Sequence, residues 1–548
     1  MSSHLMFSPL PTPAEMAAWD KTAIATFGIP EFTLMENASR EALHVMTVLT
    51  PKRTSILVIM GGGNNGGDGA ALARHLFDIG HDVLVCHTKA LEDLPETSRQ
   101  HALLARQTGV PFIPAKLHEG RLVVPSRHRQ IASSPRIVID ALLGSGFTGT
   151  LRETEFQLVE HMNTLGESAL IVSLDIPSGL DGTFGIPRPV AVRADHTITF
   201  ESAKTGLAIP HARPYTGCLH VRPIGIPAAA RQSTPASFRL LAPQRGAWPV
   251  PHSTMHKGNA GRVVIIGGSK AFPGAPVLAA LGALRAGAGL VTMVCPGGLC
   301  STLRAGFPEI MTHPLPGEVG EEDWRENMIP SLLDLLSLLP RASCVILGPG
   351  LGRSSAINKI VTAILKHEGR PDIVLDADGL YPLGADAHGV LSPLLKLLRD
   401  DDCITPHPGE AARILGTVTE DIQAARVESF HALTDASKAV IVLKGAGTLI
   451  GQGKSPITIA PFATPALAVG GSGDVLSGVI AAHMARARLF CLPPHSCDST
   501  LMAACLGVHL HGRAGEILEE RFPGRGALAR EIADAIPLAY PGTNDDSL

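Results

Sequence analysis

Short apolar runs alternate with longer stretches of helical periodicity through the first half of the chain. Residues 14–49 have apolar positions at helical spacing, and a second helical pattern continues to about residue 79. Six runs of strand length occupy 55–60, 82–86, 136–140, 169–175, 196–200 and 217–221. Because strands that alternate with helices form parallel sheets, we predict an α/β domain with a parallel sheet.

The same alternation begins again in the second half. Four runs of strand length occupy 262–266, 344–347, 372–375 and 439–443. Helical patterns begin near residues 274 and 474, and the segment 227–251 between the halves is rich in Pro, Ala and Ser with little periodicity. We therefore predict two α/β domains, residues 1–230 and 231–548, with a parallel sheet in each.

Composition excludes several classes of partner. A chain of 548 residues is too long for one core, so more than one domain is expected. The net charge of −4, the absence of a long basic run and an aromatic content of 4% argue against nucleic-acid and membrane-surface partners. The longest apolar passage, 276–296, is interrupted by Arg285 and several glycines, which argues against a membrane span.

The cysteines and the N-terminus indicate a cytoplasmic protein. Nine cysteines, including Cys491 and Cys497, form no CxxC pair. An odd count without such pairs predicts reduced thiols, and argues against a disulfide framework or a zinc site. Residues 1–20 lack the basic segment and apolar core of a signal peptide.

The segment 470–478, GGSGDVLSG, combines an anion cradle with a carboxylate. The helical pattern after it predicts a helix that begins near Asp474, whose N-terminus would attract an anion. An aspartate would repel phosphate, so Asp474 suits a general base that takes a proton from an alcohol during phosphoryl transfer. The alternative is that Asp474 is only the N-cap of the helix and the glycines form a tight turn.

A second glycine-rich run, GGGNNGGDG at 61–69, follows the first predicted strand. It contains the letters of the dinucleotide fingerprint, but no acidic residue ends the next strand, so the context of that motif is missing. The two amide side chains and bare backbone N–H groups suit a pyrophosphate or sugar hydroxyls, and Asp68 is predicted inside the turn. The alternative is a turn without a chemical role.

Asp140 and Asp175 each end a predicted strand, and His407 follows another apolar run. Ligands in open parallel sheets lie beyond the carboxyl ends of strands, so we expect Asp140, Asp175 and the 61–69 turn to meet in one crevice. Oxygen atoms there could also hold a monovalent cation; the alternative is that both aspartates are N-caps or turn residues. His407, between two prolines, is either a buried turn residue or part of the row that includes Asp474.

These segments together resemble a known fusion. Residues 64–69, 139–146 and 175–179 resemble the signature of the NAD(P)HX epimerase domain. The dehydratase that completes the fusion has a ribokinase-like fold, and its motifs resemble 256–268, 347–352, 405–410, 444–448 and 470–476. The order of the domains is similar to that of bifunctional nicotinamide nucleotide repair enzymes. The resemblance implies a Rossmann-like N-terminal domain and a ribokinase-like C-terminal domain.

The resemblance also implies a chemistry. Reduced nicotinamide cofactors can add water across the ring, which gives the hydrates NADHX and NADPHX with a hydroxyl on C6. The epimerase would interconvert their R and S forms. The dehydratase would phosphorylate the hydroxyl of the S form with ADP, or with ATP in eukaryotic relatives, after which phosphate leaves. We expect these small molecules as partners of a cytoplasmic homo-oligomer, with no nucleic acid and no membrane.

Site residues follow from the matching positions. Asp175 and Asp474 are the implied catalytic residues. The implied K⁺ ligands are Asn65, Asp140 and Ser178. Hydrate contacts of the first domain, besides Asp175, are Asn64, Asn65, Gly66, Gly67, Asp68, Gly144, Ser145, Gly146, Phe147, Thr148, Gly149 and Thr150. Those of the second domain are Ala275, Gly350, His407 and Asp474. The implied contacts of the nucleotide, ADP with Mg²⁺, are Lys444, Gly445, Ala446, Gly447, Thr448 and Gly473.

One segment departs from the family pattern. The family usually has a Gly-Asn-Pro-Gly-like turn and a Thr before the glycine run, whereas residues 463–469 are ATPALAV. The rate of this half and the choice between ADP and ATP are therefore left open. The sequence does not give the preference between NADHX and NADPHX. Two other functions are also open: a kinase of a vitamin or sugar alcohol in the second half, and a non-catalytic nucleotide-binding scaffold. Release of free phosphate, rather than accumulation of a phosphorylated product, would distinguish dehydration from a kinase.

Overall fold

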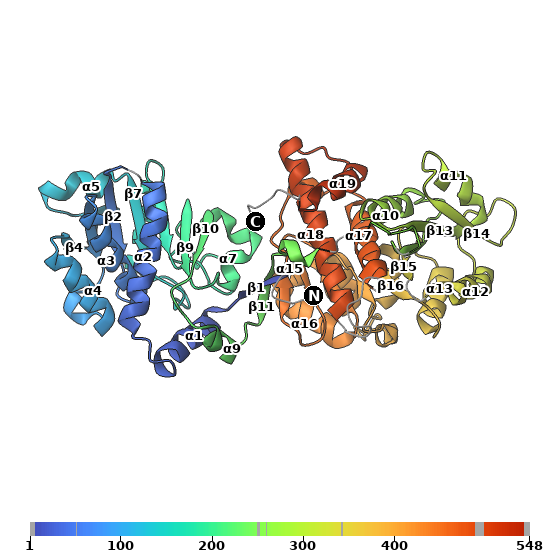
Figure 1. Cartoon of the computed structure of the whole chain (residues 1–548), viewed down its shortest axis with the longest axis horizontal. Coiled ribbons are helices and arrows are strands. Elements are labelled where there is room, and N and C mark those ends of the chain that lie inside the picture. Colours follow the sequence, from blue (N-terminus) through green and yellow to red (C-terminus); the bar gives the residue numbers. More distant parts are fainter. Residues whose placement is uncertain are drawn as a thin grey trace. The chain divides into compact units, whose positions relative to one another are not determined.

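The computed structural model describes residues 6–50, 52–248, 253–258, 260–340, 343–487 and 498–541. Cys491 and Cys497 lie outside this range. The chain forms two compact units, Pro9–Arg239 and a second unit made of residues 1–8 and 240–548 (Figure 1). That the units act as independent domains over 1–230 and 231–548 stays a prediction. None of the helices in the described ranges combines the length and apolar character that a membrane span requires.

The first unit contains a sheet of seven parallel strands in the order β10-β9-β8-β7-β2-β3-β4. These strands are β2 (Ser55–Met60), β3 (Asp82–His87), β4 (Phe112–Pro114), β7 (Ile137–Ala141), β8 (Leu170–Leu174), β9 (His196–Phe200) and β10 (Cys218–Arg222). A hairpin of β5 (Leu117–His118) and β6 (Arg121–Leu122) forms a separate small sheet. The six predicted strands are confirmed, and their apolar runs explain why: every residue from Ile56 to Met60 is buried.

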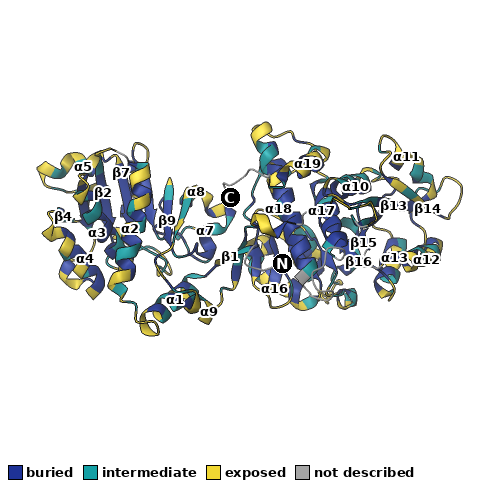
Figure 2. Ribbon diagram, in the orientation of Figure 1, coloured by how far each residue is buried: buried dark blue, intermediate teal, exposed yellow. Residues whose placement is uncertain are grey.

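Helices cover both faces of this sheet. They are α1 (Pro13–Ala25), α2 (Glu31–Leu49), α3 (Asn64–Asp78), α4 (Glu96–Gln107), α5 (Arg129–Ser133), α6 (Glu153–Leu165), α7 (Thr205–Ala208), α8 (Arg213–Thr216) and α9 (Ala228–Ser233). Ile56 and Val58 pack in one core with residues of α1 to α4, whereas Leu57 and Ile59 pack in another with residues of α5 and α6. Figure 2 shows the buried strands of this unit between helices whose outer faces are exposed. The strand order reverses between β2 and β7, which is where open α/β sheets bind ligands.

The second unit contains an eleven-stranded sheet in the order β1-β11-β20-β19-β18-β17-β16-β15-β12-β13-β14. Its strands are β1 (Phe7–Leu10), β11 (Phe238–Leu241), β12 (Arg262–Ile266), β13 (Leu290–Pro296), β14 (Met311–Leu315), β15 (Ser343–Leu347), β16 (Asp372–Leu375), β17 (Cys403–Ile404), β18 (Val440–Leu443), β19 (Leu449–Gly451) and β20 (Ile457–Ile459). The strands from β14 to β18 along the sheet are parallel, as predicted. Strands β19 and β20 are antiparallel additions, joined by short turns that the predicted βα pattern did not include.

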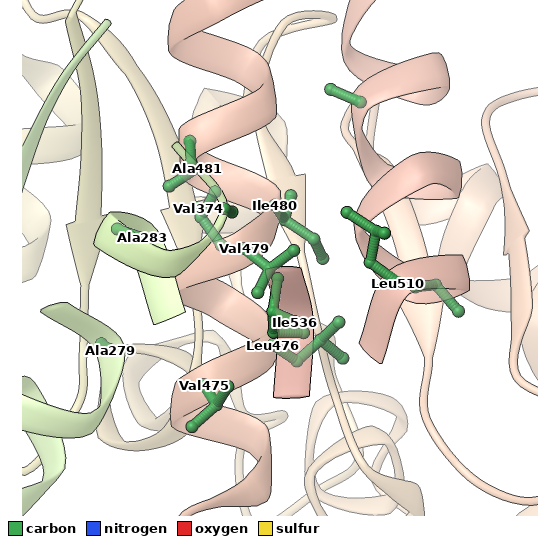
Figure 3. Packing of buried hydrophobic residues seen from close by; sticks show 14 of the residues in the cluster. Ala279, Ala283, Val374, Val475, Leu476, Val479, Ile480, Ala481, Leu510 and Ile536 are labelled. Carbon is green, nitrogen blue, oxygen red and sulfur yellow. The ribbon is translucent and has the colours of Figure 1, made fainter. Parts of the chain in front are cut away.

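Three helices of this unit, α10 (Gly274–Arg285), α18 (Asp498–Arg521) and α19 (Ala529–Ala535), pack against α17 (Ser472–Ala487). The other α-helices are α11 (Cys300–Arg304), α12 (Ile329–Leu338), α13 (Ser355–Lys366), α14 (Pro408–Leu415), α15 (Thr419–Ala424) and α16 (Arg426–Ala436). Figure 3 shows Val475 and Val479 of α17 between Ala279 and Ala283 of α10 on one side and Leu510 of α18 on the other. This packing fixes the start of α17 at the carboxyl ends of the strands.

Candidate active sites

A cavity of about 920 Å³ lies at the carboxyl ends of the strands of the first unit. Eight predicted hydrate contacts line it, namely Asn64, Asn65, Asp68, Gly144, Ser145, Gly146, Phe147 and Asp175. The other predicted contacts, Gly66, Gly67, Thr148, Gly149 and Thr150, are not among the residues that line it. The lining includes the loops after β2 and β7, so the cavity occupies the switch point of the strand order.

Helix α3 begins earlier than predicted. Its first residue is Asn64, so Asp68 belongs to the helix, and the prediction that Asp68 lies in a turn is wrong. Gly66 is buried in the first turn, where an added Cβ would lie 2.1 Å from the carbonyl oxygen of Gly61. This glycine therefore serves the close approach of helix and strand. The anion-binding N–H groups belong to the true helix start, where Gly63 is the N-cap.

Asp175 forms a buried ion pair with Lys204 in the cavity. The Ser145 N–H donates to Asp175 Oδ2 at 2.8 Å, and Lys204 Nζ also donates to Thr199 Oγ1 at 3.0 Å. Asp175 has a φ of +64°, a left-handed conformation that Asp adopts more readily than most residues. Burial alone would raise the pKa of Asp175, but Lys204 and Ser145 outweigh it and lower the pKa. Asp175 is therefore ionised, with its charge directed at one ammonium group.

Two further carboxylates in the cavity are easily protonated. Burial, the charge of Asp175 and that of Asp20 raise the pKa of Asp68 well above its usual range. Burial raises the pKa of Asp20 to about 6, against the opposing effect of Lys204. The cavity thus holds the Lys204 ammonium beside several carboxyl groups in different protonation states, an arrangement that can move a proton between two points of a bound ring.

Asn65, Ser178 and Asp140 form a hydrogen-bonded group beside the cavity. Asn65 Nδ2 donates to the carbonyl of Leu143 at 2.8 Å, the Leu143 N–H donates to Ser178 Oγ at 2.8 Å, and Ser178 Oγ donates to Asp140. Asp140 is fully buried and does not line the cavity, so the prediction that it opens into the crevice with Asp175 is wrong. Its carboxylate turns inward because Ser173 Oγ and the Ser178 N–H also donate to it.

This group has the properties of a cation site. Asn65 Oδ1 is buried without a hydrogen-bond partner. Burial raises the pKa of Asp140, although four hydrogen bonds to its carboxylate act to lower it. Within the described residues no Lys, Arg or His forms an ion pair with Asp140. A buried carboxylate and an orphaned amide oxygen together suit a cation that takes oxygen ligands. The predicted K⁺ ligands Asn65, Asp140 and Ser178 therefore fit such an ion.

Asp474 lies in the first turn of α17. The helix begins at Ser472, two residues before the predicted start, because Gly471 with a φ of +91° turns the chain into it. Asp474 is therefore inside the helix and is not its N-cap. Burial and the charge of Asp376 raise the pKa of Asp474 to about 8, against the opposing charge of Lys444.

Lys444 is the cation at the centre of this second site. Its Nζ lies 2.8 Å from Asp376 Oδ1 and 3.8 Å from Glu410 Oε2. Burial lowers its pKa, but these carboxylates outweigh burial and raise it. Burial also raises the pKa of Glu410 to about 7. An added Cβ on Gly473 would lie 3.2 Å from Lys444 Nζ, so two predicted nucleotide contacts are neighbours.

His407 caps a helix. Its Nδ1 accepts the N–H groups of Gly409 and Glu410 at 3.0 and 3.3 Å, and the Glu410 side chain accepts the His407 N–H at 2.8 Å. The side chain is 55% exposed, so the alternative of a buried turn histidine is wrong. Burial of part of the ring and the charge of Lys444 lower the pKa of His407, which keeps the imidazole neutral at physiological pH.

Comparisons with known proteins identify the family of the chain. A family model described as NAD(P)H-hydrate dehydratase matches residues 263–538, and one described as YjeF-related protein N-terminus matches residues 31–206. The bifunctional NAD(P)H-hydrate repair enzyme of Moorella thermoacetica is 34% identical over 98% of this chain and 97% of its own length. That of Escherichia coli is 35% identical over 94% and 90%. The chain belongs to the family of bifunctional NAD(P)H-hydrate repair enzymes.

The structure agrees with the predicted fold class. The prediction of two α/β units with mainly parallel sheets is confirmed. Among solved structures, a ribokinase-like superfamily protein from Enterococcus faecalis aligns over 56% of this chain and 95% of its own, with 22% identity and a TM-score of 0.44.

The remaining predicted residues of the dehydratase half lie in loops that follow strands or in the first turn of a helix. Ala275 is in the first turn of α10, and an added Cβ on Gly350 would lie 3.3 Å from its Cβ, so these two positions are neighbours. The loop 444–448 follows β18. That Ala275 and Gly350 share one binding site with Asp474 stays a prediction.

Sequence analysis missed several charged residues of these sites, among them Asp20, Lys204, Asp376 and Arg426. Lys204 and Asp376 follow the ends of β9 and β16, so position at a strand end was an available signal. Asp20 belongs to α1 and Arg426 to α16, and both reach the sites only through the tertiary fold.

Arg426 holds the predicted nucleotide loop in place. Its guanidinium donates to the carbonyl groups of Leu443, Lys444 and Gly447 at 3.4 to 3.5 Å. Burial lowers its pKa, although the group stays charged. Backbone hydrogen bonds from Lys444 to Pro406 and from Gly447 to Phe462 also hold the loop, and Arg426 adds contacts to three of the carbonyl groups in and beside it.

Arg426→Ala is therefore expected to raise the KM for the nucleotide by about tenfold, with a smaller effect on kcat, because the loop 444–448 loses its shape before it binds. Steady-state kinetics with nucleotide as the varied substrate measures this. Arg413→Ala, which removes an arginine stacked on Tyr381 at 3.8 Å, is the matched control. An unchanged KM in Arg426→Ala would show that the loop is shaped without it.

Proposed function

We propose that this chain epimerises the R and S hydrates of NADH and NADPH in its first unit and dehydrates the S form in its second unit, with ADP as phosphoryl donor. The observation that supports this most directly is the cluster of Asp474, Lys444 and Asp376 at the start of α17. It joins a base of raised pKa to a buried cation, which is what transfer of a phosphoryl group to an alcohol requires.

In the first unit the hydrate would extend across the cavity. The N-terminus of α3 and the side chain of Lys89 suit its pyrophosphate, since both lie in the lining and both attract anions. The hydrated ring would then lie toward Asp175 and Lys204. We infer that Asp175 accepts the proton of the C6 hydroxyl as the C6–N1 bond breaks, so that C6 becomes a carbonyl and N1 keeps the bonding electron pair. N1 then re-forms its bond on the other face of C6 and Asp175 returns the proton to the oxygen, which Lys204 holds throughout.

K⁺ would be held by Asn65, Asp140 and Ser178. It would supply the positive charge that the buried Asp140 lacks among the described residues, and so fix the loops after β7 and β8. The protein itself holds the loop after β7 against Asp175, because the Ser145 N–H of that loop donates to Asp175 Oδ2.

In the second unit Asp474 would take the proton of the C6 hydroxyl as its oxygen forms a bond to the β-phosphorus of ADP and the bond to AMP breaks. Lys444, Gly473 and the loop 444–448 would hold the transferring phosphoryl oxygens. Phosphate then leaves C6 as the neighbouring ring nitrogen supplies its electron pair and a ring proton is lost, which restores the reduced nicotinamide. Mg²⁺ would accompany the nucleotide, with Asp376 and Glu410 as the oxygen donors that fit it.

The direct test is to incubate the purified protein with hydrated NADH and ADP and to follow the absorbance of reduced nicotinamide together with free phosphate. Return of the absorbance with equal release of phosphate is expected. A phosphorylated product that accumulates would favour a small-molecule kinase, and nucleotide binding without turnover would favour a scaffold. ATP and NADPHX in parallel reactions decide both preferences, and light scattering tests the predicted homo-oligomer.

The dehydratase half is expected to act alone, and to be more stable when it keeps β11 at the edge of its sheet. Leu241 and Trp248 belong to the core of the second unit, so a fragment of residues 236–548 retains them whereas 252–548 does not. We expect both fragments to dehydrate the S hydrate, with a lower melting temperature for 252–548 because large apolar side chains leave the core. A fragment 236–548 that is folded but inactive would show that the halves depend on each other.

A further inference from the structure

The edge of the first sheet brings together three side chains that the proposed function does not use. Cys218 and His220 belong to β10, and His196 is the first residue of β9. The two strands are parallel, with Cys218 paired to His196. Cys218 and His220 are two residues apart and therefore project to the same face of the strand. One potential ligand atom from each of the three residues lies within 4.8 Å of the other two.

We propose that His196, Cys218 and His220 form a binding site for a zinc-class divalent metal ion. Neutral imidazole nitrogen and thiolate sulfur are the ligands that Zn²⁺ prefers, and neither suits the K⁺ or Mg²⁺ of the proposed reactions. Sequence analysis argued against a zinc site because no CxxC pair occurs. Here the three ligands come from the neighbouring strands β9 and β10, and the spacing of residues along the chain does not show that these strands pair.

The distances between the ligand atoms fit a metal ion with a small adjustment. His196 Nδ1 and His220 Nε2 lie 3.1 Å apart, with ring centroids 5.2 Å apart. Two nitrogens bound to a tetrahedral Zn²⁺ are ~3.4 Å apart, and a nitrogen and a sulfur are ~3.6 Å apart, given the usual bond lengths. The nitrogens therefore need to separate by only a few tenths of an ångström, and the exposed Cys218 side chain can rotate toward them.

The present contact between the two rings also favours a cation. A hydrogen bond between two imidazole nitrogens needs one proton, and a metal ion can replace that proton and bind both rings. The thiol of Cys218 would lose its proton on binding. Three protein ligands leave a fourth position open to water.

The proposed metal site is separate from the catalytic cavity. His196 is at the beginning of β9, whereas Phe200 at its end lines the cavity, four residues or ~13 Å away along the strand. β10 is the edge strand and pairs only with β9 in its sheet. A bound ion would join these two strands, so it should stabilise the fold and leave both reactions unchanged.

The test uses the full-length protein after removal of metals with a chelator. Titration with Co²⁺ is expected to give one saturable site per chain with a thiolate-to-cobalt charge-transfer band, and Zn²⁺ should displace the Co²⁺ and raise the melting temperature. Cys218→Ser should abolish the band, and His220→Gln should weaken Zn²⁺ binding by at least about tenfold, since each removes one of three ligands. Epimerase and dehydratase rates should match those of the parent.

Matched controls make the assignment specific to this cluster. Cys300→Ser removes another partly accessible thiol, and His211→Gln removes an exposed histidine of the same unit. Both should bind the metal as the parent does. The proposal is wrong if no saturable binding occurs, or if folded Cys218→Ser keeps the charge-transfer band and the rise in melting temperature. Either result is independent of whether the hydrates are repaired.

Discussion

Asp474→Asn is expected to lower the rate of dehydration of the S hydrate by about a hundredfold or more, while nucleotide binding stays close to that of the parent. Asparagine keeps the shape of the side chain and removes its ability to accept a proton. Asp474 lies in the first turn of α17 and not at its N-cap, so the substitution removes no capping hydrogen bond. The helix-dipole contribution of one acid there is about 0.3–1 kcal/mol, too small to unfold the unit.

The pH dependence should change with the same substitution. Asp474 is a base only when ionised, and its pKa is raised to about 8, so the parent rate should rise with pH up to that value. The pKa of Asp474 is higher in the folded protein than in the unfolded chain, so the folded protein holds this proton more tightly. The resulting contribution to the free energy of unfolding is complete below the unfolded pKa and is lost as pH rises through about 8. Asp474→Asn should therefore lose the acidic limb of the rate profile and be at least as stable as the parent at pH 8.

The experiment compares the return of reduced nicotinamide absorbance across pH, with thermal melting as a test of folding. Asp534→Asn, which removes a surface partner of Arg285, is the control carboxylate in the same unit and should behave as the parent. A folded Asp474→Asn protein that restores NADH at the parent rate would remove the base assignment and the main reason to place phosphoryl transfer in the second unit.

The strands were the most predictable part of the structure, because a buried parallel strand needs an unbroken apolar run and the sequence displays it directly. The starts of α3 and α17 were less predictable. A glycine-rich segment can form either a turn or the first turn of a buried helix, and the close contact of Gly66 with Gly61 that decides the matter is tertiary. Strand ends located Asp175 and Asp140 in sequence, but only the hydrogen bonds from Ser173 and Ser178 show that Asp140 points inward.

The partners of the predicted residues were the least predictable part. Lys204 pairs with Asp175 across 29 positions, and Lys444 pairs with Asp376 across 68. Spacing along the chain contains no information on such pairs, since each forms only when the sheet brings the ends of two strands together: β8 and β9 are neighbours, whereas β17 lies between β16 and β18. The same holds for His196 and His220, whose register belongs to the sheet and not to a local motif.

Asp175→Asn is expected to slow interconversion of the R and S hydrates by about a hundredfold, the usual effect of removing a positioned proton acceptor. Asparagine tolerates the left-handed backbone at this position nearly as well as aspartate, and its oxygen can still accept the Ser145 N–H. What it loses is the charge that faces Lys204. Because the pKa of Asp175 is lowered, the parent carboxylate stays ionised through mildly acidic pH, so any loss of epimerase rate near pH 6 should come from Asp20, whose pKa is about 6.

The second unit provides the internal control for this substitution. Dehydration of the pure S hydrate by Asp175→Asn should match the parent, whereas complete conversion of an R and S mixture should stall after the S form is consumed. Lys204→Met removes the other half of the ion pair, and it should also slow epimerisation if the pair acts together. Asp82→Asn, an exposed carboxylate of the same unit, should change neither reaction. If Asp175→Asn epimerises at the parent rate, Asp175 only anchors Lys204 and the loop at Ser145. Asp68 and Asp20, acids of the same cavity whose pKa values are raised, are then the next residues to test as proton acceptors.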